Sequence, residues 1–176
     1  MAEYIIANFE TGADGDNTIG DAAGTDYAHA RKFTIASDAN CSAASTYIRA
    51  KTGAPTGDLT FRIETNVSSK PSGTLAHANA TGIVANASIA TAAWNKADFT
   101  PFTLSAGTYW LTFVIPNQST NVNWLQSRDN NGTGQGAYSS DAGASWTLFT
   151  ANTYVGYFRV YELEADENTT NFFQMF

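Results

Sequence analysis

Cysteine, proline and charged residues are all scarce in this 176-residue sequence. The single cysteine, Cys41, excludes an intrachain disulfide, and its small side chain is expected to lie in the core rather than to act as a nucleophile. No apolar run approaches the ~20 residues of a membrane-spanning helix, so membrane insertion is not expected. Residues 1–7 also lack the basic start and long apolar stretch of a signal peptide, which favours synthesis in a cytoplasm.

Cations are especially few, with nine Lys and Arg against sixteen Asp and Glu, for a net charge of −7. A nucleic-acid partner is not expected, because phosphate binding needs a basic surface. Charged residues make up 14% of the chain, whereas about 25% is usual. The surface must therefore consist mainly of uncharged polar groups.

What the chain does contain is β-forming residues. Thr, Phe, Ile, Tyr, Val and Trp total 61, whereas Leu, Glu, Arg, Lys, Gln and Met total 28. This balance predicts an all-β protein.

The clearest strand is residues 58–64, where Leu59, Phe61 and Ile63 alternate with polar residues. The Pro-x-Gly segments 54–57 and 70–73 on either side have the composition of type I turns. Residues 10–26, with four glycines, are expected to interrupt the strand pattern. Residues 108–115 are apolar on both faces, which predicts a central strand covered on both sides. Further candidate strands are 3–9, 31–36, 45–51, 98–104, 122–127, 136–139, 145–149 and 153–163, with weaker ones between 74 and 88. Many short strands separated by turns predict a single antiparallel β-sandwich, jelly-roll-like in form.

Four segments carry a resemblance to a known group of proteins: GAPTGDLTFRI at 53–63, KPSGTLA at 70–76, Trp94 with Phe99 and Phe102, and LSAGTYWL at 104–111. Over residues 28–163 the chain resembles jelly-roll modules of phage structural proteins and of bacterial surface or secreted proteins. The resemblance implies a non-catalytic β-sandwich, of a kind used for adhesion, glycan binding and virion assembly.

Residues 139–146, SSDAGASW, resemble the Asp-box of sialidases and related propellers. In such a motif Asp141 and Gly143 shape a hairpin turn, and Trp146 packs beneath it. A propeller enzyme carries several copies, whereas this chain has one and is too short for six blades. The motif therefore predicts a structural hairpin and no sialidase activity.

Catalytic groups are poorly represented. The only histidines are His29 and His77, no nucleophile-elbow sequence is present, and no pair of carboxylates stands out as an acid and base. Zinc-ligand spacing is absent as well. The sequence therefore predicts that the protein is not an enzyme and has no cofactor, with a hydrolase as the least favoured hypothesis.

Two kinds of binding site remain open. Asp14, Asp16 and Asp21 lie in a glycine-rich segment without cations, so a structural Ca²⁺ site is the alternative to a solvated acidic loop. Aromatic rings can stack on sugars, and nearby Asn, Asp and Gln side chains can bind the hydroxyls. The candidate platforms are Trp124, Tyr138 and Trp110. The alternative for these residues is ordinary packing in the core.

The chain is predicted to divide into a sandwich at 1–164 and a C-terminal arm at 165–176. The arm ends in four large apolar residues, Phe172, Phe173, Met175 and Phe176. We expect them to dock on a neighbouring subunit or on a virion shell. In the competing interpretation they fold back on the sheet of their own subunit.

The favoured function is a non-enzymatic phage virion protein on the particle exterior, as a capsid decoration protein or a small tail or fibre component. It would be a homo-oligomer that contacts other virion proteins and, where it binds sugar, a host surface glycan. The alternative is an extracellular glycan-binding or adhesion module of a bacterial secreted or surface protein.

Overall fold

The computed structural model describes residues 2–22, 25–115, 122–130, 134–149 and 154–164. The predicted arm, with Phe172, Phe173, Met175 and Phe176, lies outside the described residues. Within them, the chain forms fourteen strands and one 3₁₀ turn, η1 (Asn86–Ser88), so the all-β prediction is confirmed. No helix of the described residues has the length and apolar character needed to span a membrane.

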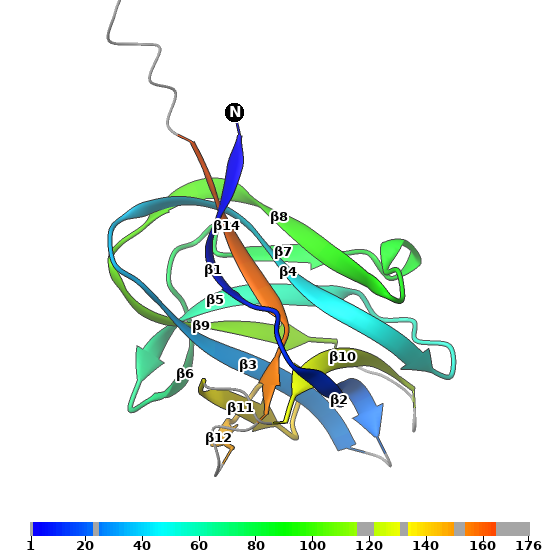
Figure 1. Cartoon of the computed structure of the whole chain (residues 1–176). Coiled ribbons are helices and arrows are strands. Elements are labelled where there is room, and N and C mark those ends of the chain that lie inside the picture. Colours follow the sequence, from blue (N-terminus) through cyan, green and yellow to red (C-terminus); the bar gives the residue numbers. More distant parts are fainter. Residues whose placement is uncertain (1, 23–24, 116–121, 131–133, 150–153, 165–176) are drawn as a thin grey trace, which may run out of the picture.

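The strands form one continuous antiparallel network that folds over into two layers (Figure 1). The first layer contains β1 (Glu3–Phe9), β2 (Ala13–Ala22), β4 (Ala39–Thr52), β8 (Ala93–Leu104), β10 (Asn123–Asp129), β13 (Val155–Gly156) and β14 (Phe158–Leu163). The second contains β3 (Thr25–Ile35), β5 (Leu59–Val67), β6 (Lys70–Leu75), β7 (Thr81–Val84), β9 (Gly107–Val114), β11 (Gly136–Ser139) and β12 (Thr147–Leu148).

The long strand β4 organises the first layer. It pairs with β8 along one edge, while β14 and β10 share its other edge. Strand β2 lies outside β10 and then pairs with β3, so the β2–β3 hairpin carries the hydrogen-bonded network from the first layer into the second. The pairing order of the second layer is β11, β3, β9, β5 and β6.

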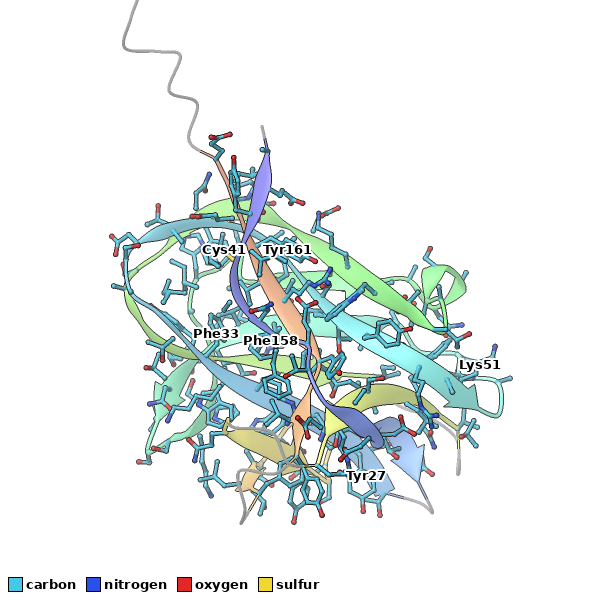
Figure 2. All side chains as sticks on the ribbon, in the orientation of Figure 1. Tyr27, Phe33, Cys41, Lys51, Phe158 and Tyr161 are labelled. Atoms are coloured by element: carbon cyan, nitrogen blue, oxygen red, sulfur yellow. The ribbon has the colours of Figure 1, made fainter. Side chains whose placement is uncertain are left out.

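The main core lies between the two layers. Leu59, Phe61 and Ile63 of β5 are fully buried, as their alternation with polar residues predicts. Figure 2 shows Phe33 of β3 and Phe158 of β14 close together, and their ring centroids are 6.2 Å apart. Cys41 belongs to the same core and is fully buried, which confirms its predicted role.

Strand β9 is covered on both faces, as its apolar sequence predicts. Leu111 and Phe113 face the main core, whereas Trp110 belongs to a second, smaller core. This smaller core also contains Ala28 and Ala30 of β3, Ala137 of β11 and Trp146. The β11–β12 hairpin therefore covers the outer face of the second layer next to β3 and β9.

Two local predictions were wrong. Residues 10–26 do not simply interrupt the pattern, because most of this segment forms β2 and pairs with β10. Pro71 lies in the short strand β6 rather than in a turn. The turn consists instead of Ser68 and Ser69, both with positive φ (50° and 60°), between β5 and β6. Positive φ at both central residues is the geometry that a two-residue hairpin requires.

Candidate binding pocket

The structure places the three predicted sugar platforms in different surroundings. Trp110 is fully buried and donates a hydrogen bond from Nε1 to Asn66 Oδ1 at 2.9 Å. Trp124 is 3% exposed, and Lys51 Nζ lies 5.6 Å from its ring centroid. Both tryptophans are core side chains, so the prediction that they form accessible sugar platforms is wrong. Only Tyr138 borders an open pocket.

The three predicted calcium ligands are spread along β2 rather than gathered. Asp14 Oδ1 accepts a hydrogen bond from the Asn130 backbone N–H at 2.6 Å, and Asp16 forms an ion pair with Arg49. Asp21 is seven residues from Asp14, a separation of roughly 23 Å in an extended strand. Among the described residues no group of three His, Cys, Asp or Glu side chains is placed to hold a metal ion. The structure therefore does not bring these three carboxylates together at one point.

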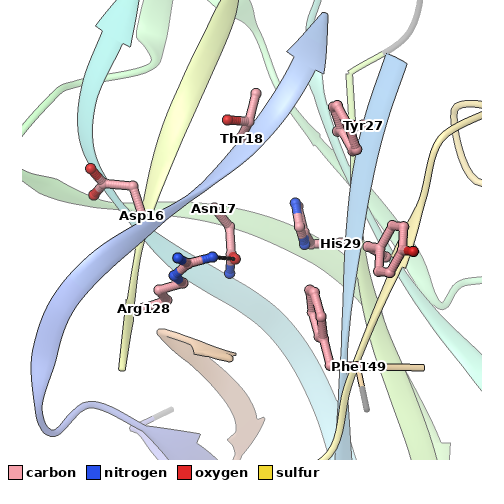
Figure 3. A pocket seen from close by; sticks show the side chains of 8 residues that line it. Asp16, Asn17, Thr18, Tyr27, His29, Arg128 and Phe149 are labelled. Carbon is pink, nitrogen blue, oxygen red and sulfur yellow. Dashed lines mark hydrogen bonds between the residues drawn. The ribbon is translucent and has the colours of Figure 1, made fainter. Parts of the chain in front are cut away.

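A pocket with a volume of about 460 Å³ lies where β2, β3, β10 and β11 meet. In Figure 3, Tyr27, His29 and Phe149 lie along one wall, with Asn17 and Arg128 across from them. The described residues that line the pocket are Asp16, Asn17, Thr18, Tyr27, His29, Arg128, Tyr138 and Phe149. The pocket thus combines aromatic surface with hydrogen-bonding side chains.

Phe149 is the centre of an aromatic cluster at this pocket. Its ring is stacked with His29, at a centroid distance of 6.0 Å and an interplanar angle of 12°. Tyr138 and Tyr154 each lie 5.2 Å from it, centroid to centroid. Beneath the ring, Arg31 Cζ lies 5.8 Å from the centroid. Mutual packing holds these rings in place, so the pocket wall is already formed without a ligand.

Polar contacts hold the opposite wall. Asn17 Oδ1 accepts a hydrogen bond from Arg128 Nη1 at 3.3 Å, and Asn17 Nδ2 donates to Gln126 Oε1 at 3.2 Å. Gln126 in turn donates to Thr46 Oγ1 at 2.6 Å. The Arg128 guanidinium also lies 4.3 Å from the centroid of the Tyr154 ring. These contacts orient Arg128 at the edge of the pocket.

His29 is buried next to the charge of Arg31. Both side chains face the same side of β3 because they are two residues apart, and their exposed fractions are 5% and 0%. Burial, followed by the charge of Arg31, lowers the pKa of His29 well below its usual value. Burial and the charge of Arg128 lower the pKa of Arg31 to about 9.

Two glycines make room for the buried guanidinium. A Cβ atom on Gly136 would lie 2.3 Å from Arg31 Nη1, and one on Gly156 would lie 2.7 Å from Arg31 Nη2. Any larger residue at either position would displace Arg31. The local sequence around β11 and β13 is thus adapted to hold a cation inside the protein.

The predicted Asp-box hairpin is present beside the pocket. Asp141 accepts hydrogen bonds from the Ser145 N–H at 2.8 Å and from Ser145 Oγ at 2.6 Å. These bonds and one from Ser139 lower the pKa of the Asp141 carboxyl to about 2. Gly143 has φ +91°, and a Cβ on it would lie 3.5 Å from the Trp146 ring. The structural interpretation of this motif is confirmed, and the hairpin positions Tyr138 on β11.

Cys41 and His77, two of the side chains considered for catalysis, do not belong to the lining of this pocket. Burial raises the pKa of the Cys41 thiol to about 12, so the thiolate does not form at neutral pH. His77 stacks on Phe102 with ring centroids 4.9 Å apart, and its Nδ1 accepts a hydrogen bond from the Asn79 N–H at 3.1 Å. Both contacts are structural.

Sequence reasoning found Tyr138 but missed most of the pocket. Asn17 and Thr18 lie in the segment that was expected to break the strand pattern, and Tyr27 and Phe149 carry no motif of their own. No local pattern marked the burial of Arg31, because its strand also contains Asp26, His29 and Lys32. The sequence matches no model of a protein family, and no curated protein is significantly similar to it.

Proposed function

We propose that the protein is a non-enzymatic, glycan-binding β-sandwich on the exterior of a phage particle, where it contacts a host surface glycan. The observation that carries the proposal is the pocket at the β2, β3, β10 and β11 strands, which joins aromatic rings to hydrogen-bonding side chains. Sugars present apolar ring faces and hydroxyl edges, so they need both kinds of contact. The volume of about 460 Å³ falls within the usual range for small-ligand pockets.

Individual side chains suit these two tasks. Tyr138 and Tyr27 are half-buried and offer ring surface, while Thr18 on the facing strand provides a hydroxyl that can donate and accept. Such mixed linings are typical of sites in which a few polar groups fix the orientation of a ligand. Catalysis is not required to explain any of them.

The position of the pocket supports display on a larger assembly. Glu3 of β1 pairs with Leu163 of β14, and the Glu164 N–H donates to the Ala2 carbonyl oxygen at 3.0 Å. Figure 1 shows the N-terminus and the end of β14 at one end of the molecule, with β2, β10 and β11 at the other. Attachment near the chain ends, as a homo-oligomer or on other virion proteins, would leave the pocket facing outward.

Strand β1 supports self-association at the attachment end. It pairs with β14 on one side, and Tyr4 and Ile5 are 50% and 45% exposed. A strand edge that carries apolar side chains favours contact with another subunit.

Light scattering on the full chain should show an oligomer, and Ile5→Lys should shift the equilibrium from oligomer towards monomer. A monomer at high concentration that also fails to bind phage particles would contradict the assembly part of the proposal.

An extracellular adhesion module of a bacterial surface or secreted protein could use the same pocket. The two alternatives differ in where the native protein is found. Mass spectrometry of purified phage particles or of the bacterial cell surface distinguishes them.

A glycan array tests the shared binding function. The intact protein should bind a defined set of glycans, and Tyr138→Ala should weaken binding at least about tenfold, which corresponds to about 1.4 kcal/mol of lost contact. Ile83→Ala is the control, because Ile83 is 62% exposed on β7 and does not belong to the pocket lining or to the β1 edge. Absence of any glycan binding, or wild-type binding by Tyr138→Ala, would contradict a sugar site in this pocket.

A further inference from the structure

The two arginines near the pocket differ from the other three arginines of this protein. Three of its five arginines form ion pairs: Arg49 with Asp16, Arg62 with Glu64, and Arg159 with Glu10. Arg31 and Arg128 form none with the described residues. In an acidic protein of net charge −7, both arginines that lack a carboxylate partner lie at the same site.

Several buried polar atoms at this site also lack hydrogen-bond partners. Arg31 Nη1 donates to the Ala30 carbonyl oxygen at 3.0 Å, but Nε and Nη2 have no partner in the described part of the chain. Nδ1 of His29 and Nε of Arg128 are unpartnered there as well. Each buried, unsatisfied polar group destabilises the folded state, and more so when it is charged. A protein keeps such a cluster when it serves a purpose other than stability.

Asp16, the carboxylate among the described lining residues, does not balance these charges. Asp16 is held by Arg49, through hydrogen bonds to both of its carboxylate oxygens. The pocket wall therefore retains the charge of Arg128, and the charge of Arg31 lies beneath Phe149. An anionic group in the pocket would be attracted by both, and strongly so because the surroundings are partly buried.

We propose that the ligand of this pocket is an acidic sugar, whose carboxylate binds the Arg128 guanidinium while its ring packs on Tyr138. This inference rests on the proposed function and adds the class of sugar. Arg128 is suited to the task, because a planar guanidinium can bind a carboxylate through two parallel hydrogen bonds. Asn17 orients it, and Arg31 adds positive potential from below the aromatic cluster.

Binding measurements with charge-matched sugar pairs test this inference. The probes are a galacturonic acid trisaccharide with its methyl ester, and sialyllactose with lactose. The wild-type protein should prefer the acidic member of at least one pair by tenfold or more. Raising NaCl from 50 to 500 mM should reduce that preference, because salt screens the attraction to Arg128 and Arg31.

Arg128→Gln should remove the preference for the acidic sugar and leave the affinity for the neutral one within about threefold. Lys70→Gln is the matched control, because it removes the same charge from an exposed position on β6 and should leave both affinities unchanged. A melting curve for each variant checks that it is folded. A preference that persists in Arg128→Gln would overturn the inference.

Other outcomes separate this inference from the proposed function. Equal binding of acidic and neutral sugars would overturn the acidic-sugar inference and leave the glycan-binding function in place. Absence of binding to any sugar would overturn both. Inorganic sulfate that binds as tightly as the best acidic sugar would also overturn the inference, because the sugar ring would then contribute nothing.

Discussion

The space between the two sheets and the wall of the pocket are both buried, yet they contain opposite kinds of side chain. Phe61, Ile63 and Leu111 fill the inter-sheet core without a polar atom. At the pocket, His29 and Arg31 are buried with nitrogen atoms that have no partner in the described part of the chain. The first region is almost entirely apolar, although Trp124 Nε1 in it has no partner among the described residues, whereas the second buries several polar nitrogens and a charge.

The difference shows where stability and function reside. The core side chains lower the free energy of the folded state through burial of apolar surface. The pocket side chains oppose folding, because their charges and unpaired groups are removed from water. Local departures from packing rules of this kind are expected at functional sites.

The largest effect should come from truncating the inter-sheet core. Phe61→Ala should lower the free energy of unfolding by about 3–5 kcal/mol, because it leaves a cavity in a fully buried position. Urea denaturation measures the change. Ile83→Ala is the control, since Ile83 is 62% exposed, and it should cost less than about 0.5 kcal/mol. Equal costs for the two variants would contradict the assignment of the main core.

The smaller core should also be essential for stability. Trp146→Ala should cost about 3 kcal/mol, at the low end for buried aromatic residues, because Trp146 is 8% exposed beneath the Asp-box turn. The same denaturation experiment measures it. If stability were unchanged while glycan binding disappeared, Trp146 would be a binding residue rather than a packing residue.

Mild acid should lower the stability of the folded protein through His29 in the pocket wall. The folded pKa of His29 is lowered by burial and by Arg31 and Arg128, so below about pH 6.5 the unfolded chain binds a proton that the folded chain does not. Stability should therefore fall as pH drops from about 6.5 to 5, by at most about 1.4 kcal/mol per pH unit. Melting temperatures across this range measure the effect.

His29→Phe is the control for this pH dependence, since it keeps a ring against Phe149 without a titrating group. It should flatten the stability profile between pH 6.5 and 5. The same slope in the wild type and in His29→Phe would show that His29 is not the group responsible.

The smallest change in stability should follow removal of the buried charge. Arg31→Met should leave the free energy of unfolding unchanged or raise it by about 1–2 kcal/mol, because apolar replacements of buried charges are often neutral or stabilising. It should also weaken binding of the acidic sugar. A loss of more than about 3 kcal/mol would instead show that Arg31 is a structural element of the fold.

The sequence by itself determined the features that depend on near neighbours along the chain. The abundance of β-forming residues predicts the fold class, and the alternation of Leu59, Phe61 and Ile63 identifies the buried face of β5. The hairpin at 139–146 is likewise local, because Ser139, Asp141 and Ser145 bond to one another. Such patterns are visible in sequence because their partners are at most a few residues away.

Only the tertiary structure decided which aromatic side chains are accessible and where the pocket lies. The burial of Trp110 depends on the β11–β12 hairpin, which follows it by more than twenty residues. The pocket wall is brought together from β2, β3, β10, β11 and Phe149, and the polar strand β2 is held in place by pairing with β10. Contacts between segments that are distant in sequence leave no local periodicity, so burial and pocket formation became visible only once the strands were paired.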